Sequence, residues 1–106
     1  MSARLEQLRE MLADDPSDPF TRYALGMELK GLGRAEEALA ELSRLLDEAP
    51  GYVPTWYQCG KLLHELGRTE RALEVLRRGV EVAQAAGDAH TTGELEDLLR
   101  LVEEAA

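Results

Sequence analysis

Apolar residues recur every three or four positions along almost the whole chain, which is the spacing of side chains on one face of an α-helix. This spacing predicts six helices and an all-α fold. We expect the first three helices over about residues 2–14, 19–32 and 35–49, the fourth around 56–66, the fifth from about 73 to 86, and the sixth around 95–102.

Residues that favour helix ends stand between these segments. Asp18 followed by Pro19 is typical of an N-cap and a first helical residue, because proline has no backbone N–H to leave unpaired there. Gly33 and Gly67 fit the left-handed residue that ends many helices, and Gly87 followed by Asp88 should end the fifth helix and cap the sixth. The connections are short, so neighbouring helices should run antiparallel.

The chain contains the same pattern twice. The segment YALGMELKGLGRAEEALAEL begins at Tyr23, and YQCGKLLHELGRTERALEVL begins at Tyr57, an offset of 34 residues. A fixed offset of this size indicates a repeated structural unit.

Gly26 and Gly60 lie inside predicted helices at the same place in each copy. Glycine in a helix interior costs about 1 kcal/mol relative to alanine, so a recurring glycine needs a reason. We expect the two helices of each copy to approach closely there, with Gly26 facing Ala38 and Gly60 facing Ala72.

A helix–turn–helix unit of this length, with Leu-Gly or a substitute in the first helix and Ala in the second, resembles the tetratricopeptide repeat. The resemblance implies a right-handed α-solenoid of antiparallel helix pairs. In the second copy Gly79 stands where Ala is usual and Gln84 where Pro is usual, so its second helix should run longer. The residues that carry the repeat signature are Gly26, Gly33, Ala38 and Pro50 in the first copy and Trp56, Gly60, Gly67 and Ala72 in the second.

The resemblance covers nearly the whole chain, which we interpret as one domain. The stretch LREMLADDP matches LSRLLDEAP at the same offset, so residues 1–18 resemble the second helix of a truncated repeat. Residues 19–52 and 53–86 would be the two full repeats. Residues 87–106 would supply a closing amphipathic helix whose leucines cover the open end.

The resemblance implies a function through a surface. In this family the first helices of successive repeats line a concave groove that holds a peptide or a helix of a partner, which predicts a non-catalytic adaptor or scaffold. Lys30 and Lys61, the only lysines, would lie on this face near Tyr23 and Tyr57, which suggests an acidic or carboxylate-bearing partner. The groove positions fall on Phe20, Tyr23, Met27 and Lys30, on Tyr57, Gln58, Lys61 and His64, and in the closing helix on Asp88, Thr91, Thr92 and Leu95.

One ligand mode of the family is not expected. Some members hold a carboxy-terminal carboxylate with a clamp of Lys, Asn, Asn, Lys and Arg. That clamp is absent because the matching positions hold Tyr23, Met27, Gln58, Asp88 and Thr92.

The chain has a formal net charge of −9 and a pI near 4.6. Nucleic acids and anionic membranes need clustered Lys and Arg, so neither partner is expected. The acid excess keeps a small protein soluble and also suits a high-salt cytoplasm. No segment approaches the ~18 apolar residues that cross a bilayer. A single cysteine forms no intramolecular disulfide, so we expect a cytoplasmic protein.

The sequence offers no set of residues for catalysis, and we expect neither an enzyme nor a cofactor nor a metal site. Cys59 has only His64 and His90 as candidate bases, and its place in the repeat turns it into the helix pair. The acidic residues alternate with Arg at helical spacing and should form solvated ion pairs.

Two other functions stay open. The chain could be a self-associating structural adaptor, a weak homo-oligomer formed through its open ends or its groove, because Leu5, Leu8 and Met11 could expose an apolar edge. It could also be a regulatory domain for an enzyme encoded separately.

Overall fold

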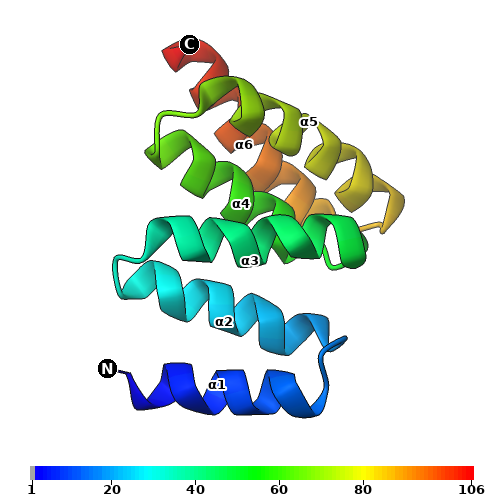
Figure 1. Ribbon diagram of the computed structural model, residues 1–106. Helices are drawn as coiled ribbons and strands as arrows, with labels where there is room; N and C mark the ends of the chain where they lie inside the picture. Colours follow the sequence, from blue (N-terminus) through cyan, green and yellow to red (C-terminus); the bar gives the residue numbers. More distant parts are fainter. Residues whose placement is uncertain (1) are drawn as a thin grey trace. The chain divides into compact units, whose positions relative to one another are not determined.

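The computed structural model describes residues 2–106 and contains six α-helices and no strand within that range (Figure 1). The predicted all-α fold is confirmed, and the ends expected for the first three helices differ from the observed ends by no more than one residue. The helices are α1 (Ala3–Asp14), α2 (Pro19–Gly31), α3 (Ala35–Glu48), α4 (Pro54–Glu65), α5 (Thr69–Ala85) and α6 (Ala89–Ala105).

The helices form two compact units. The first unit ends at Ala49 and contains α1, α2 and α3, and the second extends from Pro50 to Ala106 and contains α4, α5 and α6. In the first unit α2 packs against both α1 and α3, and in the second each helix contacts the other two. Within each unit, helices that follow one another run antiparallel, as the short connections predict (Figure 1).

Side chains and glycines define the helix ends where the sequence predicts them. Asp18 caps α2, because its carboxylate accepts one hydrogen bond from a backbone N–H and another from the Thr21 hydroxyl at 2.6 Å. Gly33, Gly67 and Gly87 follow α2, α4 and α5 with φ angles of 77°, 76° and 72°. These left-handed conformations favour glycine and confirm its predicted role at the helix ends.

Gly26 and Gly60 mark the closest approach of the two helices in each pair. A Cβ atom at Gly26 would lie 3.0 Å from Leu42 Cδ2 and 3.7 Å from the Ala38 carbonyl oxygen. A Cβ atom at Gly60 would overlap the Leu76 side chain. The missing side chains therefore leave room for two leucines that are fully buried.

The sequence predicts this close contact but identifies only part of it, because at Gly26 the Ala38 carbonyl lies near and the Leu42 side chain lies nearer. Ala38 and Ala72 are fully buried, yet the side chains that face Gly26 and Gly60 belong to the leucines one turn later. Helical side chains lean toward the amino terminus of their helix, so each leucine covers the turn that contains the alanine.

The second helix pair differs from the first in the carboxy-terminal half of its second helix. α5 has 17 residues against 14 in α3, which confirms the predicted longer helix. Gly79 allows close packing there, because a Cβ atom on it would lie 2.7 Å from Trp56 Cβ and 3.3 Å from Leu95 Cδ2. An alanine at this position would push α4 and α6 away from α5.

Each terminal helix buries part of its apolar face. In α1, Leu5 and Leu8 are only 2% and 3% exposed, and Met11 is 51% exposed. The expected apolar edge is therefore wrong for Leu5 and Leu8, because both side chains are buried where α1 packs against α2. In α6, Leu95 and Val102 are fully buried, whereas Leu101 is 54% exposed. Its exposed acidic residues are Glu94, Glu96, Asp97, Glu103 and Glu104.

The two close-contact glycines differ in tightness, so we expect their alanine variants to differ in stability. Gly26→Ala should stay within about 1 kcal/mol of wild type, because the gain in helix propensity offsets a contact that Leu42 relieves by a small shift. Gly60→Ala should lose about 1–3 kcal/mol, because its methyl overlaps Leu76. Gly26→Leu should lose about 3 kcal/mol by overpacking. Urea unfolding followed by circular dichroism measures all three, and equal losses for the two alanine variants would contradict the packing.

Asp88 should make the stability of α6 depend on pH. Its carboxylate accepts hydrogen bonds from the Thr91 N–H at 3.0 Å and from the Thr91 hydroxyl at 2.7 Å, and these bonds hold the pKa of Asp88 below its ordinary value of 3.8. Because the folded-state pKa is the lower one, the cap stabilises the protein above the unfolded-state pKa and loses this effect as the pH falls through the folded-state pKa.

The test is the thermal unfolding of Asp88→Asn, which keeps a capping side chain without the charge. Its Tm should lie below that of wild type at about pH 7 and approach it at about pH 3. A difference in Tm that is the same at both pH values would contradict the role of the ionised carboxylate.

Candidate functional site

Two rows of side chains occupy equivalent positions on α2 and α4. Each row has three residues, spaced by four and then three positions, so they lie on one side of their helix. The six side chains of the two rows are half-buried. Each row therefore borders the packed face of its helix. The α2 row consists of Tyr23, Met27 and Lys30, and the α4 row of Tyr57, Lys61 and His64.

The α2 row is partly engaged with the rest of the chain. Tyr23 and Lys30 each take part in an interaction within the described residues, and Met27 between them is apolar. Phe20, at the start of α2, is 61% exposed and adds a large apolar side chain. The surface that α2 offers to another molecule is therefore mainly apolar.

The α4 row presents polar groups that the described chain does not satisfy. Between residues 2 and 106, no hydrogen bond or ion pair is made by the Tyr57 hydroxyl, the Lys61 ammonium or the amide of Gln58 beside the row. Polar groups that are partly withdrawn from water gain most from a partner, because fewer waters compensate them. Half-buried polar groups without partners are expected of a surface that binds a ligand.

His64 adds a hydrogen-bond donor to the same row. Its Nδ1 atom is buried and has no hydrogen-bond partner in the described structure. A buried N–H without an acceptor is rarer in proteins than an unpaired acceptor, so we assign the ring proton to Nε2. In this tautomer the imidazole donates from Nε2, one helical turn from Lys61.

Lys61 differs from most other cationic side chains of the protein. In the part of the chain that the structure describes, only Lys61 and Arg78 lack an interaction partner, and Arg78 stands exposed on α5. Arg34 is typical of the others, since it donates two hydrogen bonds to Glu37, at 2.6 and 2.7 Å, and holds the pKa of that carboxyl below its ordinary value. A half-buried lysine without an acidic partner is notable in a chain with a net charge of −9.

The closing helix does not extend the rows as the sequence predicts. Leu95 is fully buried in the second unit, so its expected place in a groove is wrong. Asp88 and Thr91 bond to each other in the N-cap of α6, and the Thr92 hydroxyl donates to the Asp88 carbonyl at 2.8 Å. These polar groups are used in folding the helix end.

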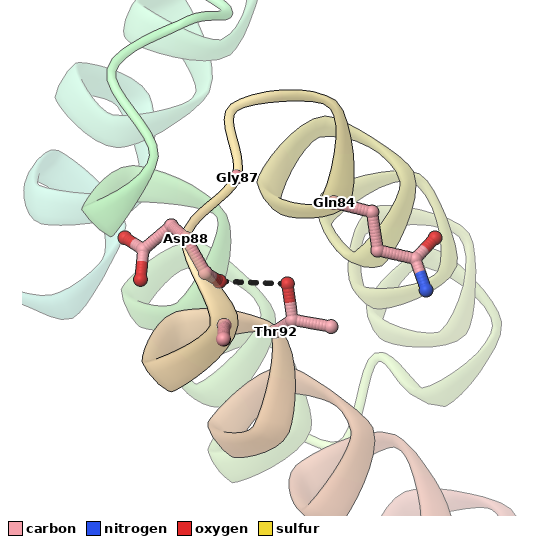
Figure 2. Close-up of a pocket in the computed structure, with 5 residues that line it drawn as sticks. Gln84, Gly87, Asp88 and Thr92 are labelled. Carbon is pink, nitrogen blue, oxygen red and sulfur yellow. Dashed lines mark hydrogen bonds between the residues drawn. The ribbon is translucent and has the colours of Figure 1, made fainter.

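A hollow of about 310 Å³ lies where α5 turns into α6, and the sequence gives no sign of it. Figure 2 shows the Thr92 hydroxyl bonded to the backbone of Asp88, whose carboxylate points away from Gln84. The polar groups of the hollow therefore do not converge on one point. Its lining residues are Gln84, Gly87, Asp88, Ala89 and Thr92.

Other kinds of site find little support in residues 2–106. Cys59 is buried, as the repeat predicts. Within this range no three His, Cys, Asp or Glu side chains are placed to hold a metal ion. The described helices also include none with the length and apolar character to cross a membrane.

The two rows belong to different units, and each is described on its own. The hypothesis that they line one groove, with Lys30 and Lys61 close enough to reach the same ligand, stays a prediction from the family resemblance.

Comparison with known proteins identifies the repeat. The family model for the tetratricopeptide repeat matches residues 29–91, more than half of the chain. The solution structure of a tetratricopeptide repeat domain protein from Salinibacter ruber is 40% identical, with a TM-score of 0.82, and the match covers 87% of this chain and 93% of that one. The solution structure of a protein from Bordetella parapertussis is 30% identical, with a TM-score of 0.83 over 99% of this chain and 91% of that one.

A more distant structure shares the fold alone. The TPR2B domain of yeast Sti1, in a complex with pHsp70, is 17% identical and has a TM-score of 0.89 over 96% of this chain and 82% of that one. No curated protein sequence matches the chain. The family model and the structural relatives together show that the chain belongs to the tetratricopeptide repeat family of protein–protein interaction modules.

Proposed function

We propose that the chain is a non-catalytic adaptor that binds a segment of a partner protein on the α4 row. The observation that carries this proposal is the α4 row, where the half-buried Tyr57 and Lys61 side chains make no hydrogen bond or ion pair within the described residues. The complex of the Sti1 domain with pHsp70 supports a segment of another protein as the occupant.

The aromatic residues of the rows suit protein recognition. Tyr23 and Tyr57 occupy the same repeat position, and Phe20 is exposed at the start of α2. Aromatic side chains bury a large area with few rotatable bonds, so they lose little conformational entropy on binding. Met27 adds a flexible apolar contact that adapts to the partner.

The proposed partner carries a carboxylate that docks on the α4 row. The Lys61 ammonium would supply the charge, and His64 Nε2 and the Tyr57 hydroxyl would donate hydrogen bonds beside it. A hydrogen bond to an ionised group is worth about twice a neutral one.

The net charge of the protein limits how acidic this partner is. A chain with a charge of −9 repels a polyacidic segment at distances up to about 8 Å in physiological salt. A segment with one isolated carboxylate among apolar residues escapes most of this repulsion.

The experiment compares how three immobilised proteins capture a partner from lysate. They are the wild type, the double variant Tyr57→Ala/Lys61→Glu and the control Arg78→Glu. The control reverses the other unpaired cation, which lies on α5 and outside both rows. We expect a partner captured by wild type and by the control, and affinity reduced about tenfold or more in the double variant. Titration calorimetry with the identified segment gives the affinities.

Two results would remove the proposal. If all three proteins retain the same partner equally, the binding surface lies elsewhere. If Arg78→Glu loses the partner as fully as the double variant, the effect of Lys61 is one of overall charge. Circular dichroism of each variant establishes that it is folded.

A further inference from the structure

The two helix pairs use the same close contact, so that contact does not distinguish them. In each pair a glycine of the first helix faces a fully buried leucine of the second, and a fully buried alanine lies one turn earlier. On α5, α2 would therefore meet the same leucine and alanine that it meets on α3, and α4 would meet the same pair on α3. The equivalent residues are Gly26 and Gly60, Ala38 and Ala72, and Leu42 and Leu76.

A second set of equivalent positions is filled in two different ways. In the first pair, Arg22 is 4% exposed and donates a hydrogen bond to Glu41 at 2.7 Å. Its other terminal nitrogen donates to the Pro16 carbonyl at 3.1 Å. The α2–α3 pair therefore holds an ion pair at a place that is almost closed to solvent.

The second pair has an apolar filling at the same place. Trp56 stands where Arg22 stands in the first pair, and its Nε1 donates to the Pro50 carbonyl at 2.8 Å. Val75 occupies the position equivalent to Glu41 and is buried. Gly79 occupies the position equivalent to Leu45 and accepts the Trp56 side chain against its backbone. The hydrogen bond to a proline carbonyl is kept, while the rest of the filling is exchanged.

Each filling fits only its own pair. If α2 packed on α5, Arg22 would meet Val75 and would be a buried cation without a carboxylate. If α4 packed on α3, Trp56 would meet Leu45 at a place where the structure leaves no room even for a Cβ atom, and Glu41 would lose its cation. The first exchange carries the penalty of an unpaired buried charge on Arg22. The second leaves the half-buried Glu41 without its cation and adds a steric overlap.

We propose that these two fillings act as a register key, which directs α2 to α3 and α4 to α5 and excludes pairing with the second helix of the other repeat. Breaking a buried ion pair makes an off-register pairing at least ~100-fold less populated. The same key excludes α2 of one copy from packing on α5 of another, which would join copies into open assemblies. The inference concerns assembly of the fold and stands independently of the proposed partner.

The test gives both pairs the same filling. In Arg22→Trp/Glu41→Val/Leu45→Gly the first pair carries the residues of the second. Replacing a buried ion pair by apolar residues often keeps or raises stability, so this triple variant should fold with the helix content of wild type. The matched control is Arg22→Lys, which lowers stability by losing the contact with Pro16 but still needs Glu41 as its partner.

Each protein is unfolded in urea, refolded at increasing protein concentration and analysed by size-exclusion chromatography with light scattering. The key predicts that the triple variant recovers less monomer than wild type and more oligomer as concentration rises. It predicts that Arg22→Lys, although less stable, recovers monomer as wild type does. The recovery of monomer would thus depend on whether the two pairs have different fillings, and it would not depend on the stability of the variant.

Three outcomes would overturn the proposal. Wild-type recovery of monomer by the triple variant would show that the fillings do not select the register. Equal losses in the triple variant and Arg22→Lys would show that recovery follows stability. A triple variant without the helix content of wild type would show that the two pairs are not interchangeable.

Discussion

The absence of a side chain at Gly26 and Gly60 is the constraint on which the rest of the structure depends. It lets Leu42 and Leu76 pack against the backbone of the first helix in each pair, where even a Cβ atom would be crowded. This contact fixes which face of α2 and of α4 is buried. Because that face is fixed, the rows that begin at Tyr23 and Tyr57 come to lie at its border, half in contact with protein and half open to a partner.

Much of this fold is encoded in local signals that the sequence displays openly. The offset of 34 residues identifies the repeat, and residues such as Asp18 and Gly33 give the helix ends to within about one residue, because caps and left-handed turns have narrow chemical requirements. What fills a space between helices is a different problem. It depends on side-chain direction, which is why Leu42 occupies the place that spacing alone assigns to Ala38.

The pair of Arg22 and Glu41 shows the same limit. An arginine in the place of a repeat tryptophan gives no sign of burial by itself, since arginine is rarely buried. The signal that could have found it is the separation of 19 residues between Arg22 and Glu41, which recurs between Trp56 and Val75. Two residues that change together from charged to apolar, at matching positions of two repeats, indicate direct contact.

The candidate site could be located from the repeat pattern, but its chemistry could not. Lys61 is followed four positions later by Glu65, a spacing at which an ion pair is expected, although the order of Lys before Glu is the weaker one. In the structure Glu65 interacts elsewhere and Lys61 is unpaired among the described residues. Whether a lysine has an interaction partner depends on how the helices around it pack. Lys61 in the α4 row has none among the described residues, whereas Lys30 in the α2 row takes part in an interaction.

The central claim, that a partner protein docks on the α4 row, is tested most directly by photocrosslinking. A photoreactive phenylalanine analogue replaces Tyr57 in one protein and the exposed Arg71 of α5 in another, and both are irradiated in lysate. The account predicts a partner crosslinked from position 57 and not from position 71, joined through a segment that contains a carboxylate. A partner crosslinked from position 71 and not from position 57 would contradict it.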